Sequence, residues 1–157
     1  MKKFILRGCM LAVLALAATQ TKVSAQATPG LDGTWFAVVI PADCQTFTPI
    51  PGAPTFRGLY LFGHDGSLTN EAAFLVVTPR RSSGLGTWRH TQAQTYAGAF
   101  QFFRYNPDGS LLSLRKVTTT IALNGDQFTT KDMFQDFDAN NMPTQSTGCN
   151  IVVATRQ

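Results

Sequence analysis

Basic and imidazole side chains alternate with aromatic ones in this 157-residue sequence. His90 lies two residues after Trp88, Arg104 lies two residues after Phe102, and Arg115 lies two residues before Val117. In an extended strand, residues two positions apart point to the same face. These polar groups are therefore predicted to share a face with apolar neighbours, where a guanidinium can hold the acidic head of an apolar ligand by charge-assisted hydrogen bonds.

Two simpler interpretations compete with this one. Asp132 shares a face with Phe128 and Phe134, so an internal Arg–Asp pair would satisfy both charges without a ligand. A local bulge would instead turn a charged side chain outward, as is common at barrel rims. Arg80 and Arg81 are placed in a loop, where they would either hold an acidic group at the mouth or form solvated surface.

Catalytic motifs are absent from the sequence, which lacks Gly-x-Ser-x-Gly, His-Glu-x-x-His, a phosphate-binding loop and Cys-x-x-Cys. His64 and His90 are the only histidines, so a multi-histidine metal site within one chain is excluded. His64 begins "HDGS", which we interpret as a tight turn because Asp-Gly is a standard hairpin pair. We predict no catalytic residue, no metal and no cofactor, which disfavours an enzyme.

The elements that must position these residues are all β-strands, since apolar residues alternate with polar ones between turns such as "NPDGS". Eight such strands joined by hairpins predict an antiparallel up-and-down barrel. Four longer connections, at 41–54, 78–85, 106–108 and 138–145, are predicted to gather at one end, which makes a cup with a mouth. The predicted strands are 33–40, 55–63, 66–77, 86–91, 94–105, 109–123, 127–137 and 146–156.

Period-two alternation also assigns the inner face. Tyr60 and Phe62 share a face with Gly58, and Tyr96 shares the equivalent face with Phe100. A barrel of eight strands is either packed solid or holds one small ligand, and the residues leave both outcomes open. If the barrel is hollow, the predicted ligand-binding residues are Tyr60, Phe62, Trp88, His90, Tyr96, Phe100, Phe102, Arg104 and Arg115.

Residues 1–25 have the pattern of a signal peptide, with Lys2 and Lys3 before a mainly apolar stretch and "VSA" at 23–25. Cleavage is predicted after Ala25, with Ala27 as the alternative, which leaves a single domain at 26–157. A secreted or periplasmic location follows. The apolar stretch is short for a membrane span of ~20 residues, so no stable membrane anchor is expected after cleavage, although a retained anchor is the alternative.

Cleavage changes both the charge and the cysteine content. Four of the 13 basic residues lie in 1–25, and the remainder balance the 9 acidic residues. A neutral domain gives no support for nucleic-acid binding, which usually shows as a basic patch. Cys44 and Cys149 remain in an oxidising setting, where a disulfide is expected. Two unpaired thiols are the alternative.

Two segments carry a family resemblance. "LDGTW" at 31–35, the long loop 41–54 and the hairpin-linked strands resemble the calycin and lipocalin-like barrels. The segment "GLGTWRHTQAQTYAGAFQFFRYNPDGSL" at 84–111 is similar to small secreted bacterial proteins, some of which resemble the allene oxide cyclase barrel. The resemblance implies that Trp35 packs across the closed end, whereas the predicted strand directions place Trp88 near the opposite end.

Three functions follow as hypotheses. The first is a secreted barrel that binds a small apolar or amphipathic ligand in its interior. The second, implied only by the resemblance, is an isomerase acting on a lipid. The third is a solid-cored extracellular structural or interaction module.

Overall fold

The computed structural model describes residues 30–73 and 80–157, and within these ranges all regular structure is β-strand. The predicted signal peptide at 1–25 and positions 74–79 lie outside the described residues. The strands are β1 (Gly33–Ala42), β2 (Phe56–Phe62), β3 (Ser67–Ala73), β4 (Arg80–Arg81), β5 (Gly84–Gln92), β6 (Thr95–Tyr105), β7 (Leu111–Asn124), β8 (Gln127–Phe137) and β9 (Pro143–Arg156).

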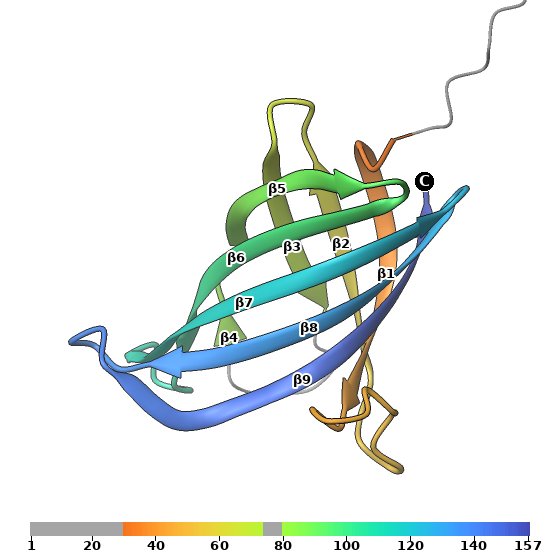
Figure 1. Cartoon of the computed structure of the whole chain (residues 1–157). Helices are drawn as coiled ribbons and strands as arrows, with labels where there is room; N and C mark the ends of the chain where they lie inside the picture. The colour runs from red at the N-terminus through yellow and green to blue at the C-terminus, as the bar shows by residue number, and fades with distance from the viewer. Residues whose placement is uncertain (1–29, 74–79) are drawn as a thin grey trace, which may run out of the picture.

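Eight of these strands close into an antiparallel barrel (Figure 1), as predicted. Each strand pairs with its neighbour in the order β1, β2, β3, β5, β6, β7, β8, β9, and β9 returns to pair with β1. The β6–β7 pairing makes the ring continuous. Within the described residues every barrel strand has a partner on each side, and the shortest pairing is that of 67–70 in β3 with 84–87 in β5. Pairing around a ring is the usual way for such a sheet to avoid edge-to-edge association.

β4 is the one departure from the predicted set of strands in the described residues. It pairs antiparallel with the end of β6, Arg80 opposite Tyr105 and Arg81 opposite Arg104. The predicted connection 78–85 therefore contains a short strand, because β6 is longer than β5 and its backbone groups beyond Gln101 need another partner. This pairing brings Arg81 to the barrel wall.

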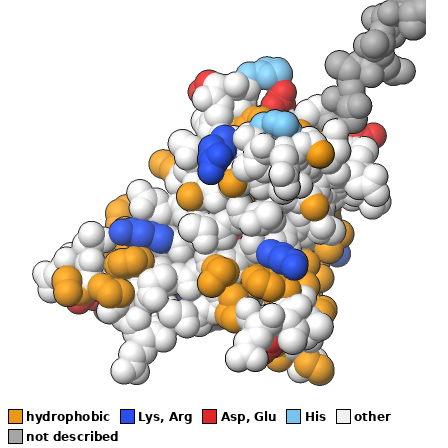
Figure 2. All heavy atoms as spheres, viewed as in Figure 1, with side chains coloured by type: hydrophobic (Ala, Val, Ile, Leu, Met, Phe, Trp, Pro, Cys, Tyr) orange, Lys and Arg blue, Asp and Glu red, His pale blue; other side chains and the backbone are white. Residues whose placement is uncertain are grey.

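The two ends of the barrel differ, as predicted. Short turns at 63–66, 93–94 and 125–126 collect at one end, near the C-terminus in Figure 1. The longer connections at 43–55, 106–110 and 138–142 lie at the other end, which we call the mouth. Hydrophobic side chains gather on the surface toward the mouth in Figure 2, and exposed Ile50 and Met142 belong to its loops.

Trp35 and its neighbours fill the closed end. Trp35 is fully buried, donates from Nε1 to the Leu31 carbonyl at 2.8 Å, and lies 4.9 Å from the Phe128 ring, centroid to centroid. The Arg156 guanidinium lies 4.2 Å from the Trp35 ring and donates to the Asp32 carbonyl at 2.5 Å. Arg156 thus covers the Trp35 ring and connects the last strand to the segment that precedes the first.

Trp88 lies at this same closed end, so its predicted position near the opposite end is wrong. Its Nε1 donates to the Gly63 carbonyl at 3.0 Å, and its ring lies 5.9 Å from Phe62. The error has a physical cause. β5 begins at Gly84 rather than at 86 and pairs in a register that sets Thr87 opposite Ser67, which moves Trp88 toward the turn at 63–66.

Candidate ligand cavity

The half of the barrel next to the mouth encloses a cavity of about 480 Å³, within the usual size of small-molecule sites. Side chains from nearly the whole ring of strands contribute to it. Its apolar wall includes Val39, Phe56, Tyr60, Phe100, Phe102, Val117 and Phe134, and its polar groups include Asn70, Arg81, Arg104, Arg115, Asp132 and Asn150.

The predicted ligand-binding residues divide into two groups. Five of them line the cavity: Tyr60, Phe100, Phe102, Arg104 and Arg115. The others lie toward the closed end, where Phe62 and Tyr96 are buried in the core and Trp88 packs on both. His90 is exposed, with Nε2 2.7 Å from the Ala93 carbonyl. The structure therefore does not bring His90 together with the two arginines.

Asp136 forms an internal ion cluster with Arg104 and Arg115. Its side chain is 2% exposed, Arg115 donates to it from Nε at 2.6 Å and from Nη2 at 2.9 Å, and Arg104 donates through Nη1. Ser146 donates to it at 2.9 Å. Burial alone would raise the pKa of Asp136, but Arg115, Ser146 and Arg104 outweigh it and hold that pKa below its ordinary value. The predicted Arg–Asp pair thus exists, with Asp136 in place of Asp132.

Arg81 is a cation without a carboxylate partner. Its Nη2 donates to Asn70 Oδ1 at 2.6 Å and to the Asn70 carbonyl at 3.1 Å, its Nε donates to the Ser82 carbonyl, and its guanidinium lies 3.6 Å from the centroid of the Phe102 ring. It forms no ion pair with any described carboxylate. Burial lowers the pKa of Arg81 to about 10, so it stays charged at neutral pH.

Gly84 makes room for this arginine. A Cβ at Gly84 would lie 2.9 Å from Arg81 Nη2 and 3.0 Å from Asn70 Oδ1, closer than real Cβ contacts. Because the position has no side chain, the guanidinium can turn into the barrel beside Asn70 and over Phe102. The sequence predicted Arg81 in a loop, either holding an acidic group at the mouth or forming solvated surface. Two features could have indicated that Arg81 turns inward: Gly84, three residues later, and the part of β6 that extends beyond its pairing with β5.

Asp132 and Tyr60 lie deeper in the cavity than the ion cluster. Asp132 is 2% exposed, and its Oδ1 has no hydrogen-bond partner among the described residues. Burial raises the pKa of Asp132 to about 6, despite the nearby hydroxyl groups of Thr119 and Thr130. Burial also raises the pKa of Tyr60, and the charge of Asp132 adds to that effect. The cavity therefore contains an unsatisfied carboxyl group among aromatic side chains.

This raised pKa predicts how stability depends on pH. Between about pH 4 and pH 6, folded Asp132 retains a proton that the unfolded chain has lost, since its ordinary pKa is 3.8. The free energy of unfolding should fall as pH rises through this window, by up to about 3 kcal/mol in total. Asp132→Asn should abolish this loss, as measured by urea unfolding of the ligand-free protein at pH 4.5 and pH 7.

Asp108→Asn is the control for that measurement. Asp108 is exposed in the 106–110 turn, and its pKa is lowered by hydrogen bonds from Ser110, so its titration lies below the window. The control should keep the fall in stability seen in the wild type. An unchanged fall in Asp132→Asn would show that Asp132 is not the group responsible.

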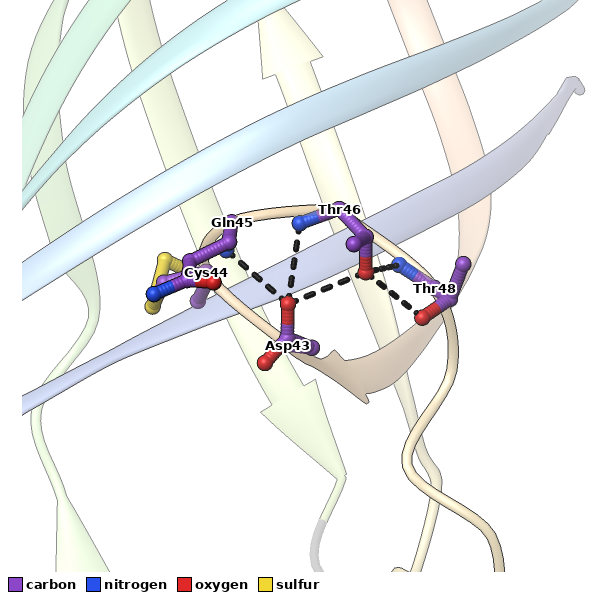
Figure 3. The surroundings of a disulfide bond; sticks show 6 residues. Asp43, Cys44, Gln45, Thr46 and Thr48 are labelled. Carbon is purple, nitrogen blue, oxygen red and sulfur yellow. Dashed lines mark hydrogen bonds between the residues drawn. A yellow bond between two sulfur atoms is a disulfide. The ribbon is translucent and has the colours of Figure 1, made fainter.

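The disulfide lies at the edge of the cavity. Cys44 and Cys149 are bonded, as predicted, with their Cα atoms 5.2 Å apart, and Cys149 also lines the cavity. Figure 3 shows the loop that carries Cys44, where Asp43 Oδ1 accepts from the Gln45 and Thr46 amides at 3.0 and 2.9 Å. Those hydrogen bonds, that of Thr46 first, lower the pKa of Asp43. The bridge and this turn together fix the start of the 43–55 connection.

Two other features of the described residues bear on the type of site. A groove of about 560 Å³ on the outer wall is lined by exposed Thr87, Arg89 and Met133. We prefer the inner cavity because three arginines and the buried Asp132 line it. No group of three or more His, Cys, Asp or Glu among the described residues is placed to hold a metal ion. Within the described ranges, no helix is long and apolar enough to cross a membrane.

The fold and site define a class of protein: a closed eight-stranded antiparallel barrel with a ligand-sized cavity at its mouth, which fits a calycin-like fold in general. Comparison with known proteins found no matching family model, no matching curated protein and no matching solved structure. The resemblance to the allene oxide cyclase type therefore gains no support from these comparisons.

Proposed function

We propose that this protein is an extracytoplasmic binding protein that holds a small amphipathic molecule with an acidic group inside its barrel. The observation that carries the proposal is the cavity of about 480 Å³ in which Arg81 forms no ion pair with a described carboxylate. An apolar body would pack between Phe100, Val117 and Phe134. Its burial contributes ~25 cal/mol per Å² before the costs of binding are subtracted.

The charges of the cavity favour an acidic ligand. Arg104 and Arg115 share Asp136, so their cluster retains a positive charge, and Arg81 adds another. Asp132 offsets at most one of these charges, and the total stays positive in either protonation state of Asp132. A carboxylate or similar anion on Arg81 would add an ion pair to its hydrogen bonds, which the neutral oxygens of Asn70 and Ser82 do not provide.

The location is part of the same proposal. The disulfide between Cys44 and Cys149 is the kind of bond that oxidising compartments favour. The predicted signal peptide at 1–25 agrees with export. A secreted or periplasmic protein with such a cavity would meet its ligand outside the cytoplasm.

The alternatives are less well supported. A solid-cored module requires the interior to be filled, whereas a cavity of about 480 Å³ lies beyond the closed end that packs around Trp35 and Phe128. The isomerase hypothesis came from the family resemblance alone, and the comparisons add nothing to it.

Binding of straight-chain carboxylates tests the proposal. The wild type should bind octanoate, decanoate or dodecanoate in isothermal titration more tightly than the alcohol or trimethylammonium compound of equal length. Arg81→Gln should weaken carboxylate binding by about 10-fold or more, since a hydrogen bond to a charged group contributes ~1.5–3 kcal/mol. Native mass spectrometry of the protein from its source should also show a bound acid of similar size.

Arg89→Gln is the matched control, because Arg89 is exposed on the outer wall. It should bind the carboxylates as the wild type does. Equal affinity for carboxylate and alcohol would contradict the anchoring role of Arg81. Lack of binding by every compound in the series would contradict the binding function itself.

A further inference from the structure

We infer that the bound molecule carries, besides its acidic group, a neutral hydrogen-bond donor such as a hydroxyl, which donates to Asp132 at the inner end of the cavity. The inference rests on the proposed function and makes it more specific. It starts from the buried Asp132 Oδ1, which accepts no hydrogen bond among the described residues although the Thr119 and Thr130 hydroxyl groups lie near the carboxyl group. Buried polar atoms without a partner are rare in native proteins, and each one costs ~1–3 kcal/mol when left unsatisfied.

The strand register sets the depth of this group. Asp132 lies opposite Thr119 on β7 and Asn150 on β9, whereas Asp136 lies opposite Arg115, four residues nearer the mouth on the same face. Four residues of strand span ~13 Å along the wall. Arg81 pairs with Arg104, at the mouth end of β6. The cavity therefore has a cationic end near the mouth and a single carboxyl further in.

Apolar side chains separate the two polar ends. Phe100 lies opposite Val117, which in turn lies opposite Phe134, and all three line the cavity between Asp132 and the arginines. A molecule that fills this cavity would place its acid on Arg81 and its apolar body across this layer. Its far end would then meet Asp132.

The charges select the kind of donor. An ionised carboxyl group only accepts hydrogen bonds, so the partner of Asp132 must donate. A cationic donor is disfavoured because three arginines already line the cavity and the total charge is positive. A hydroxyl supplies the donor without adding charge. The ligand class is thus a hydroxy acid whose two polar groups lie at opposite ends of an apolar body.

Matched pairs of probes test this inference. Each ω-hydroxy carboxylate of 8, 10 or 12 carbons is compared by isothermal titration at pH 7.5 with the unsubstituted carboxylate of the same length. The wild type should bind the hydroxylated member of at least one pair about 10-fold more tightly, the effect of a hydrogen bond to a charged acceptor. Asp132→Leu should reverse this preference, because its side chain offers no acceptor and packs better on a methyl group.

Asp132→Asn is a second variant that tests the inference if Asp132→Leu does not fold. Asparagine keeps a carbonyl acceptor and loses the charge. It should reduce the preference within each pair to a few-fold. Asp108→Asn, in an exposed turn, should leave the preference unchanged. Circular dichroism confirms folding of each variant.

The outcomes separate this inference from the proposed function. Equal affinity within every pair, with binding still weakened by Arg81→Gln, would overturn the inference and leave the binding function in place. A hydroxyl preference that persists in Asp132→Leu would also overturn it, because the donor would then bind elsewhere. Lack of binding by all six probes would overturn both.

Discussion

The double variant Cys44→Ser/Cys149→Ser is expected to unfold with a free energy about 4–5 kcal/mol lower than that of the wild type. The bridge joins residues 105 positions apart, and in the chain-entropy model closing a loop of that length removes ~4.7 kcal/mol of conformational freedom from the unfolded chain. The bridge also lies at the seam of the barrel, because Cys149 is paired with Ala42 where β9 meets β1. The loss would be a large part of the ~5–15 kcal/mol typical of a domain.

Urea unfolding with and without reductant measures this effect. Reduced wild type should match the double variant, and the double variant should not respond to reductant. A difference in unfolding free energy below about 1 kcal/mol would contradict the chain-entropy model. It would mean that β1 and β9 stay close in the unfolded ensemble without the bridge.

Asp136→Asn is expected to lower the free energy of unfolding by about 3–5 kcal/mol, the usual cost of removing one partner from a buried ion pair. The change leaves Arg104 and Arg115 facing each other without the carboxylate that both contact. Each arginine is 19% exposed, so partial access to water at the mouth should keep the loss toward the lower figure. Urea unfolding at pH 7 measures it.

Asp132→Asn is the matched comparison for this prediction. It makes the same chemical change on the same strand and the same face, four residues deeper. Because Asp132 lacks a cationic hydrogen-bond partner and Asp136 has two, the two variants should change stability in opposite directions at pH 7. A similar loss in both would show that the cost comes from the asparagine side chain itself and not from the broken ion cluster.

Replacing the whole ion cluster separates the attraction between its charges from the cost of removing them from water. A variant with Arg104→Met, Arg115→Met and Asp136→Leu removes the buried charges together with their desolvation cost. It should recover most of the stability that Asp136→Asn loses. Failure to recover would assign the loss to poor packing at the mouth.

Most of the barrel could be predicted from the sequence because its signals are local. Alternation of apolar and polar residues identified the strands, and turns such as "NPDGS" at 106–110 separated them. Eight consecutive hairpin-linked strands have few ways to bury one face, and closure is the usual one. The disulfide was expected from two cysteines in an oxidising setting, and closure agrees with it because it brings the first and last strands together.

The candidate site was only partly predictable. The two-residue alternation correctly placed Arg104 and Arg115 on the inner face. It could not identify their acidic partner, because Asp132 and Asp136 lie an even number of positions apart and so point to the same face. Arg81 was placed in a loop where it could hold an acidic group at the mouth, but its turn into the barrel was not predicted, because a two-residue strand has no periodic signal. Trp88 was assigned to the correct face of its strand but to the wrong end of the barrel. Its position along the barrel axis depends on the register between β3 and β5, which the sequence pattern does not specify.

The sequence by itself therefore determined the strands, their inner faces and the closed ring, since each follows from contacts between residues close in the chain or from a simple order of hairpins. Only the tertiary structure decided which polar groups meet inside. It paired Asp136 with two arginines, left Asp132 Oδ1 without a partner and brought Arg81 in through β4. The physical reason is that the position of a residue along the barrel axis depends on strand register. Register is set by pairing between residues that are far apart in the sequence.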